Sequence, residues 1–188
     1  MTWTVRRAAA ADAAEIARIN VNSWRRAYRG IVADDFLDAM DPEQRVPGWE
    51  RWIASPEPSA VFVTVDETGR IGSYAGVGAA RPEEDDEDFP EPTGELYAIY
   101  ADPDLWGTGA GGAVHRVALR HLAESGFTTA VLWVLDDNAL ARNFYRSQGW
   151  QDDDVHKDFE LNGKHLPERR YSVDLSQARL GVDHPNSV

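Results

Sequence analysis

Polar and hydrophobic positions near the start of the chain predict a strand followed by a helix. Residues 2–7, TWTVRR, alternate in the manner of a first β-strand. A helical period then continues to about Tyr28. Asp12, with Glu15 three residues later, resembles a capping box at the start of that helix.

The next part of the pattern predicts two shorter helices and then two paired strands. Residues 33–40 and 42–54 fit helices, and the second is expected to be interrupted at Pro47-Gly48 because proline removes a backbone donor. Residues 60–81 fit two strands that are joined by a Glu-Thr-Gly turn.

Strands and helices alternate in the second half of the chain. An acidic, proline-flanked loop over 82–94 leads into it, and Gly149 is expected in a C′ position after the second helix. The final hairpin is expected to turn at Asn162-Gly163. The predicted elements are a strand over 95–101, a helix over 109–125, a strand over 129–135, a helix over 138–148 and a hairpin over 160–175.

This order of elements predicts a mixed α/β fold with a central sheet. A chain of 188 residues is long enough to bury one core, so we expect a single domain over 1–175 and a loose tail over 176–188. No apolar run reaches the ~18 residues that a membrane span needs, and the first residues lack the apolar segment of a signal peptide. A cytoplasmic protein that does not contact a membrane is therefore expected.

The composition argues against a metal centre and against a covalent cysteine intermediate. There is no cysteine, which removes disulfides, thiolate ligands and a thiol nucleophile together. His115 and His121 lie six apart on a predicted helix, about 600° of rotation, so they face different directions. We expect no metal.

The formal net charge of −13, from 19 basic and 32 acidic residues, bears on the partners. A polyanionic nucleic acid would be repelled. Cationic small molecules would be attracted, although the acidity can equally serve solubility alone.

The stretch with the clearest chemistry is WGTGAGG, residues 106–112. It satisfies the dinucleotide pattern G-x-G-x-x-G, but five residues separate the preceding strand from Gly107, whereas a dinucleotide site needs the strand to run directly into the first glycine. The strands before it also read as hairpins rather than as successive βαβ units. Dinucleotide binding is therefore the weaker alternative for this loop.

The second interpretation is a pyrophosphate loop that opens a helix. Successive backbone N–H groups, unobstructed at the glycines, converge on a pyrophosphate at the positive end of the helix. This arrangement supplies local positive potential without lysine, in a chain whose net charge is strongly negative.

Three features stand together in residues 95–150: the strand end YADP, the loop WGTGAGG and the segment DNALARNFYRSQGW. With these features, residues 95–150 resemble the acetyl-CoA-binding core of the GNAT N-acetyltransferase superfamily. The resemblance implies a central, mostly antiparallel sheet of about seven strands with one splayed parallel pair, flanked by about four helices. It also implies transfer of an acetyl group from acetyl-CoA to an amine by direct attack.

The resemblance implies a cofactor site along one strand and the loop that follows it. Pantetheine would pair with the strand backbone, which would also supply the oxyanion contact, and Asn138 would contact the cofactor arm or serve only as a helix N-cap. Trp106 stands where the family usually has Gln or Arg. The resemblance therefore still implies backbone contacts to the phosphate, but not the polar side-chain contact that Gln or Arg would make. The implied cofactor-binding residues are Ile99, Tyr100, Ala101, Trp106, Gly107, Thr108, Gly109, Ala110, Gly111, Gly112, Asn138 and Tyr145.

Two catalytic residues are implied as well. Tyr145 matches the family tyrosine near the sulfur, and a phenol of pKa ~10 beside a thiol of pKa ~8.5 is better suited to hydrogen bonding than to full proton transfer. Glu95 begins the key strand, where family members often carry a carboxylate base; a solvent-facing edge residue is the alternative.

The acceptor amine is not specified by the sequence beyond a small molecule or a peptide. Trp24 and Tyr28, four apart on one helix face, would border the acceptor cleft by resemblance, although the same spacing suits a core stripe. The competing function is a catalytically degenerate module that binds and senses acyl-CoA. A monomer or a homodimer is expected.

Overall fold

The computed structural model describes residues 2–81, 92–161 and 163–176. Residues 82–91 of the loop expected over 82–94, Asn162 of the predicted turn and residues 177–188 of the tail expected over 176–188 lie outside the described residues. In chain order the elements are β1 (Thr4–Arg7), η1 (Ala10–Asp12), α1 (Ala13–Ala27), α2 (Asp34–Ala39), α3 (Pro42–Ile53), β2 (Ala60–Val65), β3 (Ile71–Ala79), β4 (Thr93–Ala101), η2 (Pro103–Leu105), α4 (Ala110–Glu124), β5 (Thr129–Leu135), α5 (Ala139–Ser147), β6 (Gln151–Leu161) and β7 (Lys164–Asp174).

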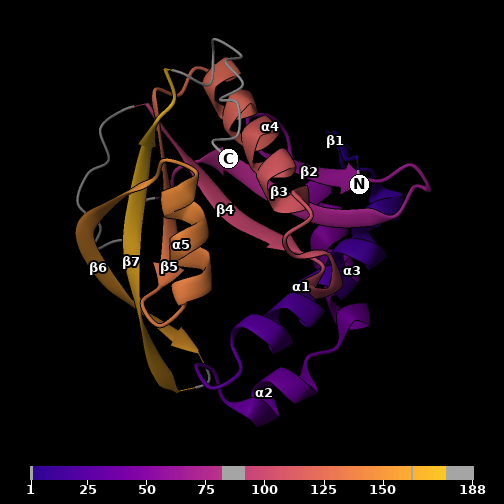
Figure 1. Ribbon diagram of the computed structural model, residues 1–188, viewed down its shortest axis with the longest axis vertical. Helices are drawn as coiled ribbons and strands as arrows, with labels where there is room; N and C mark the ends of the chain where they lie inside the picture. Colours follow the sequence, from indigo (N-terminus) through magenta and orange to yellow (C-terminus); the bar gives the residue numbers. More distant parts are fainter. Residues whose placement is uncertain (1, 82–91, 162, 177–188) are drawn as a thin grey trace.

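The strands form one seven-stranded sheet in the order β1-β2-β3-β4-β5-β7-β6 (Figure 1). Neighbouring strands are antiparallel except β4 and β5, which are parallel. That pair is in register only from Thr93–Thr129 to Glu95–Val131, and the two strands then diverge. The predicted mostly antiparallel sheet with one splayed parallel pair is confirmed.

Helices cover the two faces of the sheet. On β3, Tyr74 packs with α1 and α3 through Ile16 and Trp49, whereas the next residue, Ala75, packs with α4 and α5 through Val114 and Tyr145. Since successive strand residues point to opposite faces, α1 and α3 lie on one side and α4 and α5 on the other. Each face has its own buried cluster.

A third cluster joins the two halves of the molecule below the diverging strands. It contains Tyr28 at the end of α1, Leu37 of α2, Leu135 of β5 and Leu166 of β7. Lys164 donates from its ammonium to the carbonyl of Ile31 at 2.7 Å, which ties the β6–β7 hairpin to the connection between α1 and α2. Side-chain packing therefore closes the gap between the diverging strands β4 and β5 at this end.

The expected capping box at the first helix is wrong. The Asp12 carboxylate accepts from the Ala9 backbone N–H at 2.7 Å and pairs with Arg6 at 2.6 Å, and it makes no side-chain cap on α1. Glu15 instead pairs with Arg18. Arg6 of β1 pairs with the Asp12 carboxylate, which the sequence pattern had predicted to cap the helix.

Two other boundaries differ from the prediction. The third helix, α3, runs without interruption through Pro47. Two residues after the proline, the Trp49 ring packs edge-on against Tyr74, with ring centroids 4.8 Å apart, and this contact holds the helix on the sheet. Strand β6 begins at Gln151, well before the expected residue 160, since an exposed edge strand needs no hydrophobic alternation. Gly149, with φ +88°, follows the C-cap of α5 as expected.

Within the described ranges, no helix is long and apolar enough to cross a membrane.

Candidate functional site

The divergence of β4 and β5 opens a cavity of about 1740 Å³. Ligand pockets commonly measure ~300–1,000 Å³, so this space is large enough for a cofactor and an acceptor together. The structure brings most of the predicted site residues into its lining. Those lining it are Trp24, Tyr28, Ile99, Tyr100, Ala101, Trp106, Gly107, Gly109, Ala110, Gly111, Gly112, Asn138 and Tyr145.

The glycine loop presents the start of α4 to this cavity. Gly107 and Gly109 have φ values of +79° and +89°, in the left-handed region that glycine tolerates. A Cβ added at either position would meet no atom within 4 Å, which leaves the approach to the backbone open. The first turn of α4 has no intrahelical partners for its N–H groups and carries no acidic side chain. The loop is therefore suited to an anion.

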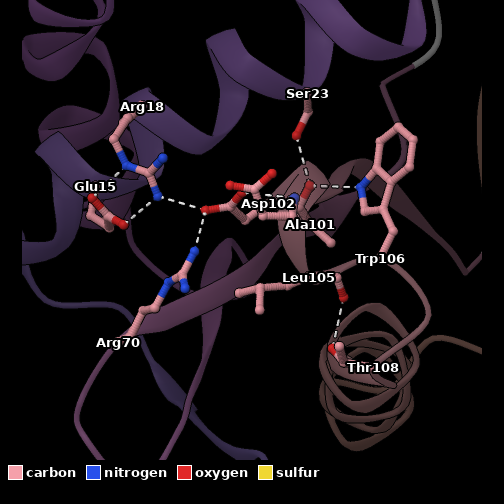
Figure 2. Close-up of polar contacts among 10 residues, drawn as sticks. Glu15, Arg18, Ser23, Arg70, Ala101, Asp102, Leu105, Trp106 and Thr108 are labelled. Atoms are coloured by element: carbon pink, nitrogen blue, oxygen red, sulfur yellow. Dashed lines mark hydrogen bonds and ion pairs between the residues drawn. The ribbon is translucent and has the colours of Figure 1, made fainter.

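The end of β4 is held by two side chains that donate to one carbonyl (Figure 2). The Ser23 hydroxyl donates to the Ala101 oxygen at 2.8 Å, and the indole N–H of Trp106 donates to the same oxygen at 3.0 Å. Trp106 thus fixes the strand end from within the loop, a role that the sequence did not indicate.

Asp102, the next residue, is a buried carboxylate between two arginines (Figure 2). It accepts from Arg18 at 2.8 Å and from Arg70 at 3.1 Å, and from the backbone N–H of Asp104 at 3.1 Å. Burial alone would raise the pKa of Asp102, but these hydrogen bonds outweigh it and lower the pKa below its usual value. The turn into the loop is thereby anchored to both α1 and the β2–β3 connection.

Thr108 does not line the cavity, and its assignment to the cofactor site stays a prediction. Its hydroxyl donates to the Leu105 carbonyl at 2.7 Å, and its own carbonyl accepts from the Trp3 indole at 3.2 Å. Both contacts are made to other residues of the protein and away from the cavity, so Thr108 stabilises the loop on the side that does not line the cavity.

Three residues of α4 that the sequence reasoning missed also line the cavity. Arg116 and Arg120 are the basic residues of its described lining, and an Arg116 guanidinium nitrogen lies 3.7 Å from where a Cβ on Gly112 would be. His115 is buried and its Nε2 accepts from the Trp150 indole at 2.8 Å. Burial, with Arg116 nearby, lowers the pKa of His115 to about 4, so it is neutral at pH 7. Arg116 and Arg120 follow Gly112 by one and two helical turns, and this spacing was the available signal for the two arginines.

Helix α5 places two predicted residues on the opposite wall. Asn138 is its N-cap, as expected, and accepts from the Ala141 N–H at 3.1 Å. Tyr145 is buried within the wall, and burial raises the pKa of its phenol above the usual value. The phenol therefore keeps its proton across the physiological range.

Aromatic side chains line the cavity where α1 meets β4. Trp24 and Tyr28 form an edge-on pair with centroids 4.8 Å apart, and the hydroxyls of Tyr28 and Tyr100 are 2.9 Å apart. Burial raises the pKa of both tyrosines, which keeps them neutral. The predicted acceptor residues thus lie beside the strand that the cofactor is expected to follow.

Glu95 is placed differently from the other predicted catalytic residue. It is buried in the paired part of β4, outside the residues that line the cavity, and its carboxylate accepts from the Arg81 backbone N–H at 3.1 Å and pairs with the Arg81 guanidinium at 3.2 Å. Its role as a base stays a prediction.

Comparison with known proteins agrees with this geometry. A model of the acetyltransferase (GNAT) family matches residues 20–150. The uncharacterised N-acetyltransferase YuaI of Bacillus subtilis is 33% identical over 166 residues, which are 88% of this chain and 89% of that protein. The mycothiol acetyltransferase of Thermobifida fusca is 35% identical over 140 residues, which are 71% of this chain but only 41% of that protein.

Solved structures share the fold at lower identity. The yncA protein of Salmonella typhimurium, solved with its cofactor acetyl-CoA, superposes with a TM-score of 0.67 at 22% identity, over 94% of this chain and 96% of that one. The ribosomal-protein-alanine N-acetyltransferase of Brucella melitensis gives 0.67 at 20% identity, over 91% and 99%.

Proposed function

Because the chain belongs to the acetyltransferase (GNAT) family, whose acyl donor is acetyl-CoA, we propose that it transfers an acetyl group from acetyl-CoA to a primary amine by direct attack. The observation that carries the proposal is that the glycine loop and the diverging strands β4 and β5 meet in one cavity. The cytoplasmic location and the monomeric or homodimeric state remain predictions.

The charge and the backbone of the described lining residues support acetyl-CoA as the donor. The N–H groups of Gly109 to Gly112 would hold the pyrophosphate, with Arg116 and Arg120 adding charge in a chain that is otherwise acidic. The backbone of Ile99 to Ala101 would bind the pantetheine arm as an added strand. Bound acetyl-CoA supplies the acetyl group as a thioester.

The chemistry requires the amine to be neutral when it attacks. A bond forms between the amine nitrogen and the acetyl carbon, the carbon–sulfur bond breaks, and the nitrogen loses a proton. An alkylammonium of pKa ~10.4 costs about 4–5 kcal/mol to deprotonate at pH 7, so a base must accept that proton. Glu95 is our candidate for the base, acting through water.

Tyr145 is proposed to stabilise the departing sulfur. Its raised pKa makes it a poor acid but a persistent hydrogen-bond donor, which suits negative charge that develops on the thiolate. Such a donor lowers the barrier without giving up its proton.

A thermal-shift titration tests the proposal first. Acetyl-CoA and CoA at ~100 times Kd are expected to add about 2.7 kcal/mol, a rise of roughly 5–10 °C, whereas NADH and NADPH should add none. An amine screen that follows CoA release then tests turnover. A rise with NADH alone contradicts the cofactor assignment, and tight CoA binding without transfer to any amine favours the sensing module.

A further inference from the structure

Two backbone carbonyls of the glycine loop accept hydrogen bonds from side chains that lie far away in the sequence. Trp3, just before β1, donates its indole N–H to the carbonyl of Thr108 at 3.2 Å, across 105 positions of the chain. Ser73 of β3 donates its hydroxyl to the carbonyl of Ala110 at 3.0 Å. Neither Trp3 nor Ser73 is among the described residues that line the cavity, so both carbonyls are held by donors outside the lining.

The direction of a carbonyl fixes the direction of the next backbone N–H. In a planar trans peptide, the C=O and the N–H that follows it point in opposite directions. The bond to Trp3 therefore turns the N–H of Gly109 away from Trp3, and the bond to Ser73 turns the N–H of Gly111 away from Ser73. Gly109 and Gly111 both line the cavity, and neither N–H has a hydrogen-bond acceptor in the described part of the chain.

The peptide between Thr108 and Gly109 is one that could reverse. Gly109 has a φ of +89°, and glycine adopts negative φ about as readily as positive φ. A reversal of this peptide plane changes the sign of φ at Gly109 and exchanges the positions of the N–H and the Thr108 carbonyl. The carbonyl oxygen carries partial negative charge and would repel a phosphate. The bond from Trp3 holds the peptide in the orientation that suits an anion.

Trp3 has a fixed seat on the sheet. Its ring lies against Gly72 of β3, where an added Cβ would be 2.3 Å from Cη2 of the indole. Glycine at position 72 therefore makes room for the ring. The Gly72 carbonyl accepts from the Asp102 N–H at 2.9 Å, so the same residue also contacts the turn that leads into the loop. The next residue after Trp3 is Thr4, which pairs with β2.

Ser73 has only one hydroxyl proton, and its direction is determined. The hydroxyls of Thr64 and Ser73 are both buried and lie 2.9 Å apart. A carbonyl can only accept, so the Ser73 proton goes to Ala110 and the Thr64 proton goes to Ser73. A buried hydroxyl that turned away would leave the Ala110 carbonyl without this donor, which is unfavourable. Ser73 is therefore a constant donor to the start of α4.

We propose that Trp3 and Ser73 are positioning residues of the pyrophosphate site. They hold the carbonyls of Thr108 and Ala110 away from the cofactor and thereby direct the N–H groups of Gly109 and Gly111 to the phosphates. The inference rests on the proposed binding of acetyl-CoA and adds two residues that do not touch the cofactor themselves.

Amide NMR of the CoA complex tests the proposal residue by residue. A hydrogen bond to phosphate moves an amide proton downfield, so CoA should move the amide protons of Gly109 and Gly111 in the wild type. Trp3→Phe should remove most of the shift at Gly109 and leave the shift at Gly111, and Ser73→Ala should do the reverse. A general loss of stability would not produce this pairing. Equal shifts in the wild type and both variants overturn the inference.

Isothermal titration measures the consequence for affinity. Each variant should raise the Kd for CoA about five-fold, the factor that corresponds to the loss of one hydrogen bond. Trp52→Phe is the control for Trp3→Phe, because it removes an indole bond of the same 3.2 Å length from α3, outside the cavity lining. Thr64→Val is the control for Ser73→Ala, since it removes a buried hydroxyl but leaves the Ser73 donor in place. Both controls should bind CoA as the wild type does.

A donor without pyrophosphate separates positioning from folding. Acetyl-pantetheine keeps the thioester and the pantetheine arm but has no phosphate. In Trp3→Phe and Ser73→Ala, kcat/KM with acetyl-CoA should fall about five-fold, whereas kcat/KM with acetyl-pantetheine should match the wild type. Equal losses with the two donors assign both residues to folding and overturn the inference.

The wild type separates this inference from the proposed function. If CoA binds the wild type and both variants equally, the positioning role fails and the function stands. If CoA binds as expected but no amine is acetylated, the transfer reaction fails and the positioning role stands. The absence of CoA binding to the wild type contradicts the two together.

Discussion

Trp106 donates its indole N–H to the carbonyl of Ala101 at 3.0 Å, so the first residue of the glycine loop is bonded to the end of β4. The family resemblance implies Gln or Arg at this position, which suggested that a side-chain contact to phosphate was missing. The structure gives the side chain another role, because it fixes the distance between the strand that would hold pantetheine and the loop that would hold pyrophosphate.

Replacing Trp106 by Phe should weaken acetyl-CoA binding by about five-fold. The ring is retained but the hydrogen bond is lost, and one such bond contributes about 1 kcal/mol. Isothermal titration measures the affinity. Trp106→Gln, which restores an amide donor, is the matched variant. Equal affinity in Trp106→Phe and the wild type would show that the bond does not position the loop.

Gly109→Ala should reduce affinity for CoA by more than ten-fold. The left-handed backbone costs a non-glycine residue about 1–2 kcal/mol, and we expect the new methyl group, which would lie in open space, to obstruct the approach of the pyrophosphate to the loop. Gly126→Ala, with φ +100° and equally open surroundings, is the control for strain alone. If both variants bind CoA normally, the loop does not hold the pyrophosphate.

Tyr145→Phe should lower kcat about ten-fold or more while the Kd for CoA stays within a few-fold, because only the hydrogen bond to the departing sulfur is removed. Stopped-flow transfer and CoA titration separate the two effects. Tyr171→Phe, which removes a buried hydroxyl that accepts from Arg142, is the control. Unchanged kcat, with chemistry shown to be rate-limiting, would exclude Tyr145 from the mechanism.

Asp102→Asn should destabilise the protein by about 2 kcal/mol at neutral pH. Breaking a buried ion pair costs about 3–5 kcal/mol, and both arginine partners of Asp102 are partly exposed, which reduces the loss. The Tm should fall by about 4–8 °C.

The difference between Asp102→Asn and the wild type should depend on pH. The folded pKa of Asp102 lies below its unfolded value, so its stabilisation is complete above the unfolded pKa of ~3.9 and disappears as the pH falls through the folded value. The two melting curves should therefore converge below about pH 4. Asp104→Asn, an exposed neighbour, should match the wild type throughout.

Glu95→Gln tests the base. If Glu95 accepts the proton, the acid limb of the kcat/KM profile should disappear and kcat should fall by about 100-fold. Arg81→Gln removes the ion pair and leaves the carboxylate, so it controls for structure. An unchanged acid limb with a lower Tm would assign Glu95 to the Arg81 pair alone.

Local patterns in the sequence determined the elements, the loop and the helix caps that depend on neighbouring residues. Backbone conformation and short-range hydrogen bonds specify features that a sequence can predict. These features are the glycines at 107 and 109, the N-cap at Asn138 and the C′ position at Gly149. Strand β6 was underestimated for the same reason, since its exposed polar start carries no periodic signal.

Contacts between distant residues were decided only by the tertiary structure. Arg6 pairs with Asp12, which the sequence had predicted to cap the first helix, and Arg81 pairs with Glu95, which lies outside the cavity lining. Glu168 lines the cavity from β7, which lies between β5 and β6 in the sheet. A carboxylate's partner depends on which cation the folded chain brings within reach, and the strand order that brings them together is a property of the whole sheet.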